Sequence, residues 1–152
     1  MRIYKANYLH LYLAALNLAQ SDREEMDRVA PGRDPIDVLT ASSGDPTTMH
    51  ISDDSGNVLA VGGHSEGLIW FVHTERATKL SLSDKLRMFR LLAEHLITIK
   101  VQAMRKRPRD EFHFTNIVSV ENEHHIKLLD CLGAHWWKDT TFNGHTFRQF
   151  FF

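Results

Sequence analysis

The sequence lacks most of the features that assign a protein to a class at first sight. It has a single cysteine, Cys131, so it cannot form an internal disulfide, and a reducing compartment is the simplest interpretation. Its formal net charge of −1 provides no overall field that would attract nucleic acid or an anionic membrane. The apolar run at the N-terminus is interrupted by Tyr, His and Asn and has no small-residue cleavage pattern. Neither a membrane span nor a signal peptide is therefore expected.

What is present is the composition of an ordinary globular domain. Hydrophobic residues make up 43% and charged residues 24% of the 152 residues. A chain of this length can bury a core without disulfides. There is no internal repeat and no low-complexity segment, so we expect one domain over residues 1–152.

The N-terminal third predicts a strand followed by two helices. Residues 2–5 fit a strand, and Asn7 can cap a helix in which Leu9, Leu13 and Leu16 recur at helical spacing. A second, more highly charged helix follows directly.

The second helix is expected to begin at Ser21, which together with Glu24 has the spacing of a capping box. The middle of the chain after this helix predicts an antiparallel meander. The next stretch is rich in proline and glycine and predicts a loop with one short helical turn at residues 35–39. Three strand signals follow, separated by turn residues: 49–53, 58–62 and 68–73.

The longest helix is expected after these strands. Ser81 or Ser83 can cap it, and Pro108 stops it after a basic end that favours the helix dipole. This basic run, residues 100–109, lacks the interleaved aromatics of a nucleic-acid site and is interpreted as a solvated helix end. The expected buried stripe is Leu86, Phe89, Ala93 and Leu96.

The last forty residues carry the clearest pattern. Residues 112–120 predict a strand, residues 122–132 a helix, and Gly133 its C-terminal cap. A closing hairpin is expected around Asn143-Gly144, with strands at residues 136–141 and 145–152. The whole order, β-α-α-β-β-β-α-β-α-β-β, predicts a mixed α/β (α+β) fold.

This order and the C-terminal segment resemble the GNAT acyl-CoA N-acyltransferases. Asn122, Leu128 and Gly133 fall in register with the pattern that follows the fifth strand of that family. The resemblance covers most of the chain in element order, but the motif is confined to residues 112–137. It implies a mixed central sheet flanked by helices. The tyrosine that often serves as general acid in the family is Leu129 here, which has no proton to give.

A second departure concerns the loop that holds the cofactor pyrophosphate in GNAT enzymes. Its glycines let main-chain N–H groups close on the phosphates at a helix N-terminus. If Arg76 is the first residue of the motif, Lys79 and Ser81 occupy the glycine positions. No glycine occurs between Gly67 and Gly133, so a shifted alignment does not restore the loop. We therefore expect no cofactor, and acetyl-CoA only if the protein is an enzyme.

The chain also resembles internal virion protein A of T-seven-like podophages, a family with a degenerate GNAT-like domain. The shared features are the strand Trp70-Phe71-Val72, the non-glycine loop and long basic helix after it, and the segment from Asn122 through His125 and Ile126 to Gly133-Ala134. The departures from the GNAT enzyme motifs described above are thus features that this phage family also has. The resemblance implies a role in the phage particle or its assembly.

If the protein is an enzyme, His73 or Glu75 at the end of the third meander strand is the candidate base. The alternative is that both are ordinary residues at a strand end. The residues that would line a cofactor cleft are Val72, Arg76, Lys79, Ser81 and Asn122.

Neither metal binding nor thiol chemistry is expected. Ten histidines are present, but no His pair has i,i+4 spacing on a helix, and no Cys-x-x-Cys occurs. His125 is expected to pack beneath the sheet. Cys131 is expected to be partly buried and unactivated.

The aromatic C-terminus is a candidate interface. Trp136, Trp137, Phe150, Phe151 and Phe152 lie on the closing hairpin, and alternation along its strands would leave some rings outside the core. A hydrophobic tail packed beneath the first helix is the alternative interpretation.

The missing glycines and tyrosine argue against acetyltransferase activity, and the resemblance to the podophage family implies a phage internal virion or assembly protein. It would act through protein–protein contacts in particle assembly or genome ejection. An acetyl-CoA-dependent N-acetyltransferase and a small adaptor or inhibitor of a host protein are the alternatives. The expected partners are other virion or assembly proteins, or a host protein, and a homo-oligomer is left open. The expected location is the virion interior, and the host cytoplasm before packaging.

Overall fold

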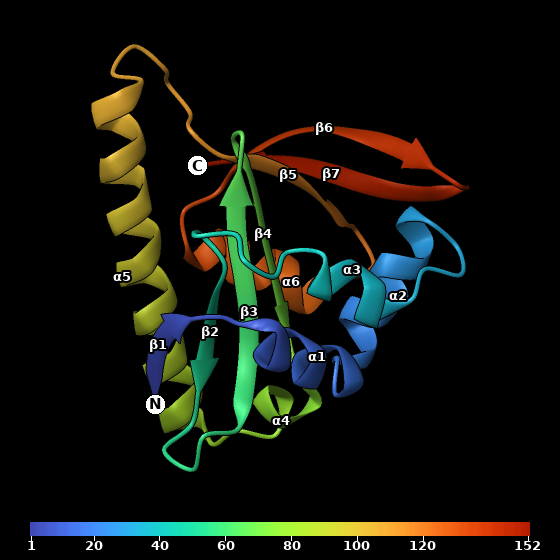
Figure 1. Cartoon of the computed structure of the whole chain (residues 1–152). Coiled ribbons are helices and arrows are strands. Elements are labelled where there is room, and N and C mark those ends of the chain that lie inside the picture. Colours follow the sequence, from blue (N-terminus) through green and yellow to red (C-terminus); the bar gives the residue numbers. More distant parts are fainter.

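The computed structural model describes residues 1–152 as one seven-stranded sheet with helices on both faces (Figure 1). The N-terminal half contains β1 (Arg2–Lys5), α1 (Tyr8–Leu16), α2 (Gln20–Val29), α3 (Pro35–Thr40), β2 (Met49–Ser52), β3 (Val58–Ser65) and β4 (Leu68–His73). The remainder contains α4 (Glu75–Thr78), α5 (Leu82–Lys106), β5 (Thr115–Ser119), α6 (Glu123–Cys131), β6 (His135–Phe142) and β7 (His145–Phe151). The predicted mixed α/β fold is confirmed.

The sheet has the strand order β1-β2-β3-β4-β5-β7-β6. All neighbouring strands are antiparallel except β4 and β5, which are parallel and share one register pair, Leu68 with Thr115. Beyond that pair the two strands diverge, so the sheet is split along this line (Figure 1). A parallel pair with so short a ladder leaves main-chain groups of both strands free for other partners.

Alternating side chains of β4 serve the two faces of the sheet. Trp70 and Val72 pack with the cluster formed by α1, α2 and α3. Phe71 packs against the N-terminal half of α5, and Ile69 joins the cluster between α5, α6 and β7. The core is therefore divided into layers on either side of the sheet.

Helix α1 directs a different face to the core from the one predicted. Its buried residues are Leu11, Ala14 and Ala15. The predicted stripe is exposed instead, with 57% of Leu9, 38% of Leu13 and 50% of Leu16 accessible. Because the helix is apolar on all sides, periodicity alone does not select the buried face. The two alanines allow α1 to approach the sheet closely.

The start of α2 also differs from the prediction. The helix begins at Gln20 with Ala19 as its N-cap, and no side chain caps it. The main-chain N–H of Gln20 donates instead to Glu75 Oε1 at 2.9 Å. A residue distant in sequence thus satisfies the helix end that the Ser21 capping box was expected to satisfy.

Helix α5 begins as predicted, and its predicted stripe is confirmed in part. Ser81 caps it by accepting from Asp84 N at 3.2 Å. Its buried residues are Met88, Leu96 and Ile99. Of the predicted stripe, Leu96 is buried, Phe89 and Ala93 are half-buried, and Leu86 is exposed. The short helix α4 between β4 and α5 was not predicted.

The C-terminal elements agree best with the prediction. Asn122 caps α6 by accepting from His125 N at 3.2 Å, and Gly133 has the left-handed φ of +82°. Asn143 and Gly144 have φ values of 49° and 80°, as a tight hairpin turn requires. Strand β5 is shorter than predicted. None of the helices combines the length and apolar character that a membrane crossing needs.

Candidate functional site

A cavity of about 470 Å³ lies where β4 and β5 diverge. Its lining is mostly apolar and comes from both faces of the sheet, with Val72 of β4 and Ile117 of β5 among the lining residues. At the narrow end, Asn116 Nδ2 donates to the carbonyl of Ile69 at 2.7 Å and joins the two strands where the ladder stops. This hydrogen bond therefore continues the contact between the two strands one residue beyond their ladder pair.

At the wide end of the gap between β4 and β5 lie five polar residues, which we call the cleft cluster: Asp22, Glu25, His73, Asn122 and His125. Asp22 Oδ2 accepts the main-chain N–H of His73 at 2.7 Å and lies 2.7 Å from His73 Nδ1. Asn122 Nδ2 donates to Glu25 Oε2 at 2.6 Å and lies 3.3 Å from Asp22 Oδ1. These contacts join α2, β4 and α6 across the gap in the sheet.

Within the cleft cluster, neighbouring groups shift the pKa values of Asp22 and His125. Burial alone would raise the pKa of Asp22, but hydrogen bonds from His73 and the nearby imidazoles lower it on balance. Burial would lower the pKa of His125, but the carboxylate of Glu25, 3.8 Å from Nδ1, raises it on balance. Asp22 is therefore ionised at neutral pH, and His125 gains proton affinity from the carboxylate opposite it.

The main-chain groups at the end of β4 are satisfied by the segment between α1 and α2. The carbonyl of His73 accepts from Ala19 N at 2.9 Å, and the N–H of Glu75 donates to the carbonyl of Asn17 at 2.8 Å. The N–H of Thr74 donates to Leu59 O at 2.9 Å. Each of these groups therefore has a partner within the chain.

The loop after β4 is neutralised by carboxylates. Arg76 Nε donates to Asp53 Oδ2 at 2.8 Å. Burial would raise the pKa of Asp53, but hydrogen bonds from Asn57, Arg76 and Ser55 lower it to about 2. Ser81 caps α5 and also donates to Asp84 Oδ2 at 2.7 Å. Of the two cations predicted in this loop, Arg76 is paired with Asp53 and Lys79 is in no salt bridge.

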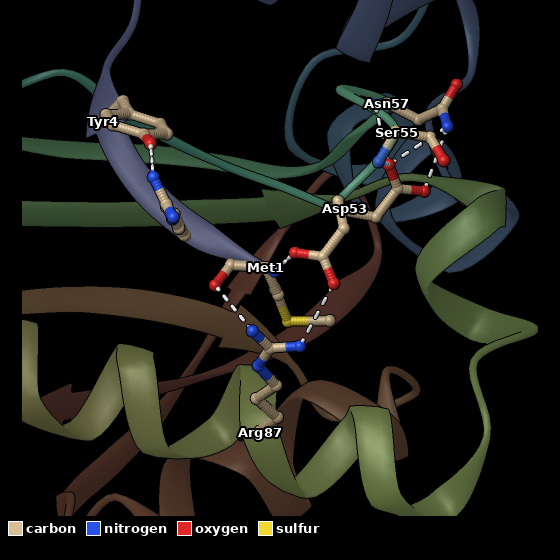
Figure 2. A network of polar contacts seen from close by, with 8 residues as sticks. Met1, Tyr4, Asp53, Ser55, Asn57 and Arg87 are labelled. Atoms are coloured by element: carbon tan, nitrogen blue, oxygen red, sulfur yellow. Dashed lines mark hydrogen bonds and ion pairs between the residues drawn. The ribbon is translucent and has the colours of Figure 1, made fainter.

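A polar network next to this loop binds the N-terminus of the chain (Figure 2). Arg87 Nη2 lies 3.5 Å from the carbonyl of Met1, and its Nη1 lies 3.3 Å from Asp54 Oδ2. The α-amino group of Met1 contacts Asp54 as well. Asp54 and Asp84 line the same surface hollow as Arg76 and Lys79.

The structure brings some of the predicted cleft residues together and separates others. Val72 lines the cavity, and the buried Asn122 belongs to the cleft cluster. Arg76, Lys79 and Ser81 lie apart from them, at the surface beside the N-terminal end of α5. Asp22 and Glu25 were not predicted, because their helix has the composition of a solvated one.

The two candidate bases are placed differently. Glu75 is half-buried, and its carboxylate accepts from Gln20 N. His73 forms a dyad with Asp22 beside the cavity. No group of three or more His, Cys, Asp or Glu side chains is arranged to hold a metal ion.

The hairpin aromatics divide into core and surface. Phe150 and Phe152 are buried between α5, α6 and the sheet, so they are not available as interface residues. Trp136 and Phe151 are half-buried, and Trp136 Nε1 donates to Asp130 Oδ1 at 2.6 Å. Trp137 is exposed. Cys131 is exposed as well, contrary to its predicted partial burial.

The sequence matches a family model described as bacteriophage T7, probable scaffold protein Gp13, over residues 47–141. The chain belongs to this family. The match begins before β2 and ends within β6, so it includes the diverging strands and the long helix. No curated protein matches the sequence.

Solved acetyltransferase structures share the fold. The GNAT-family acetyltransferase of Bacillus cereus ATCC 10987 superposes with a TM-score of 0.60 at 11% identity, covering 99% of this chain and 95% of that one. The GNAT domain of S. lividans PAT gives a TM-score of 0.61 at 11% identity, with 99% and 89% covered. The N-acetyltransferase of Staphylococcus aureus Mu50 gives 0.57 at 10% identity, with both chains covered completely, 100% and 100%. The GNAT-like fold is confirmed, and at these identities the likeness extends to the fold alone.

Proposed function

We propose that this member of the scaffold protein family acts in phage particle assembly through protein–protein contacts and does not transfer acyl groups. The observation that carries the proposal is the occupation of the β4 end by the chain's own groups. His73 is held by Ala19 and Asp22, and Glu75 is held by Asn17 and Gln20.

An acyltransferase of this fold needs those groups for its substrate. Main-chain groups of this strand polarise the thioester, and preorganised donors aimed at the reacting atom supply much of the rate enhancement. Here a thioester would have to displace Ala19 or Asp22 from His73. Each buried polar group left without a partner would cost about 1–3 kcal/mol. These contacts at the end of β4 therefore disfavour polarisation of a thioester by the main chain of this strand.

The electrostatics of the loop after β4 support the same conclusion. A pyrophosphate would meet Asp53, Asp54 and Asp84 as well as Arg76 and Lys79. The carboxylates of Asp53 and Asp54 already neutralise Arg76 and Arg87. Like charges near a binding site weaken an anion's affinity, and no glycine main chain is present to offset that loss.

Calorimetric titration with acetyl-CoA tests the absence of acyl transfer. We expect no saturable binding up to about 1 mM, which corresponds to a binding free energy weaker than about −4 kcal/mol. Arg76→Ala is the matched control, because a weak heat that vanishes in this variant reflects surface attraction of an anion. A micromolar dissociation constant for the unmodified chain would contradict the proposal.

The proposed location is the host cytoplasm during assembly and the virion interior afterwards, with other assembly proteins or a host protein as partners. Quantitative mass spectrometry of purified procapsids and mature particles tests it. Protein in both particles supports an internal virion component, whereas protein in procapsids alone indicates a scaffold that leaves. Absence from both would contradict an assembly role.

An N-acetyltransferase is the second candidate, favoured by the dyad of His73 and Asp22 beside the cavity. A carboxylate that orients an imidazole is a common arrangement for a general base. Under this function, His73→Asn abolishes acetyl transfer to amines, and Glu75→Gln lowers the rate if Glu75 is the base. Equal background rates of acetyl transfer in the unmodified chain, His73→Asn and Glu75→Gln would exclude this second function.

A further inference from the structure

Helix α1 and strand β2 meet through two stacked imidazoles, which we call the imidazole pair. The rings of His10 and His50 lie with their centroids 3.7 Å apart and their planes 18° from parallel. His10 lies in the first turn of α1 and is partly exposed, whereas His50 lies on β2 and is 5% exposed. The pair therefore joins the N-terminal turn of α1 to the sheet.

The hydrogen bonding of both rings requires them to be neutral. His10 Nδ1 accepts the main-chain N–H of Asn7 at 3.2 Å, and this contact is one half of the capping box of α1. A proton on that nitrogen removes the acceptor and ends the contact. The buried Nδ1 of His50 has no hydrogen-bond partner. Because an imidazolium carries a proton on both nitrogens, charging His50 would bury an N–H without an acceptor.

No carboxylate is paired with either ring. The ion pairs between histidines and carboxylates lie elsewhere in the chain: Asp22 with His73, Glu25 with His125 and Glu121 with His145. On the strands beside β2, Tyr4 of β1 places its uncharged ring 6.0 Å from that of His50, and Val61 of β3 is the register partner of His50. The pair is therefore flanked by groups without charge at pH 7.

The charged groups on the surrounding elements either have the wrong sign or are held elsewhere. Lys5 of β1 and Arg33, which lines the same cavity as His50, are cations. Asp45, before β2, accepts from the main-chain N–H and the hydroxyl of Thr47. On α3, which packs against α1, Asp34 caps its own helix and Asp37 is exposed. None of these groups forms an ion pair with an imidazolium at the pair.

The electrostatics of the pair give its response to acid a definite sign. Burial lowers the pKa of both imidazoles, and the adjacent ring of His10 lowers that of His50 further. Once α1 leaves the sheet, both groups return toward their ordinary value of 6.5. The stability that the pair contributes is therefore present above 6.5 and is lost as the pH falls through the folded values.

We propose that the imidazole pair is an acid-sensitive switch, which holds the N-terminal turns of α1 on the sheet while both rings are neutral and releases them when the rings are protonated. Release uncovers the apolar cluster in which Leu11 and Ala14 of α1 pack with Val61 of the sheet. The switch is separate from the cleft cluster and does not depend on whether the protein transfers acyl groups.

Amide hydrogen exchange of the full chain, followed by NMR at about pH 7.5 and about pH 5.5, tests the proposal. Each rate is divided by that of an unstructured peptide at the same pH, which gives a protection factor. Each imidazole that is protonated on opening favours opening by about tenfold per pH unit between the folded value and 6.5. The protection factor of the Leu11 N–H, which donates to Asn7 O, is therefore expected to fall about tenfold or more relative to those of β3.

His10→Gln separates the switch from a structural role of this residue. Glutamine at this position can still accept the Asn7 N–H of the capping box but does not titrate. The acid-induced loss of protection in α1 is expected to shrink about tenfold in this variant. His124→Gln is the matched control, because it removes an exposed histidine from α6 and is expected to leave the loss unchanged. Circular dichroism checks that both variants fold.

NMR titration of the imidazole resonances provides a second readout that a merely structural role does not move. In the unmodified chain, His10 and His50 are expected to titrate below pH 6.5. His10→Gln is expected to raise the midpoint of His50 by about half a pH unit or more, because the adjacent ring is gone. Midpoints at or above 6.5 in the unmodified chain would overturn the proposal even if the variant fails to fold. So would equal loss of protection in α1 and β3, or the same loss in α1 with and without His10.

Discussion

The two ends of the gap between β4 and β5 are held together by different chemistry. At the narrow end, one ladder pair and the amide of Asn116 join the strands, and apolar side chains fill the space beyond. At the wide end, Asp22 and His73 belong to the buried cleft cluster, which bridges α2, β4 and α6. There the chain's own groups satisfy the main-chain groups at the end of β4.

Removal of a carboxylate from the wide end is expected to have the largest effect on stability. Asp22→Ala leaves the main-chain N–H and the imidazole of His73 without their carboxylate partner in a buried site and is expected to lower the free energy of unfolding by about 3–5 kcal/mol. Urea denaturation measures the change. The control is Glu24→Ala on the same helix, which removes an exposed carboxylate and is expected to change stability by about 0.5 kcal/mol or less. Equal effects of the two substitutions would show that the cleft cluster contributes nothing special.

A smaller loss is expected at the narrow end. Asn116→Ala removes the donor to the carbonyl of Ile69 and is expected to cost about 1–2 kcal/mol in the same assay, as for one partly buried hydrogen bond. A loss as large as that of Asp22→Ala would mean that the two ends do not differ in the way described.

The pH dependence of stability sharpens the comparison further. The lowered pKa of Asp22 gives stability that is present above its ordinary value of 3.8 and is lost as pH falls through the folded value. The raised pKa of His125 gives stability that is full below 6.5 and is lost as pH rises through the folded value. Burial lowers the pKa of His50, His64 and His95, and these groups act in the opposite direction.

The contribution of His125 is therefore isolated by comparing the unmodified chain with His125→Asn at each pH. The stability difference between them is expected to be largest below pH 6.5 and to shrink as the pH rises. A difference that does not change with pH would show that His125 is neutral throughout and packs without an ionic role.

The smallest effect is expected outside the gap, at the loop after β4. Arg76→Ala breaks an exposed pair with Asp53 and is expected to change stability by about 0.2–1 kcal/mol, less at high salt. Thermal denaturation at two salt concentrations measures it. A larger, salt-independent loss would show that this loop contributes to the fold as much as the cleft does.

The C-terminal elements could be predicted because their signals are local. Asn122 and Gly133 bound α6, and Asn143-Gly144 forms the hairpin turn, since each of these conformations depends on its own side chain. The mixed central sheet was implied by the resemblance to a family rather than by any single residue.

The wide end could not be predicted because it is formed by contacts between distant segments. Asp22 and Glu25 lie on a helix whose charge pattern is that of a solvated one, and nothing local shows that α6 approaches it. The prediction of the buried face of helix α1 was wrong for a related reason. Leu9 and Leu11 lie on opposite faces, so periodicity fits two orientations, and the packing of small residues against the sheet decides between them.

Amide hydrogen exchange at the wide end tests most directly whether the chain itself occupies the place of a substrate. The N–H groups of Ala19, His73 and Glu75 are predicted to exchange as slowly as those of the central strand β3, since each donates to a partner within the chain. Addition of acetyl-CoA is predicted to leave these rates unchanged. Fast exchange at His73 and Glu75 that becomes slow on addition of acetyl-CoA would contradict the account, because it would show that these groups are free and that the cofactor binds them.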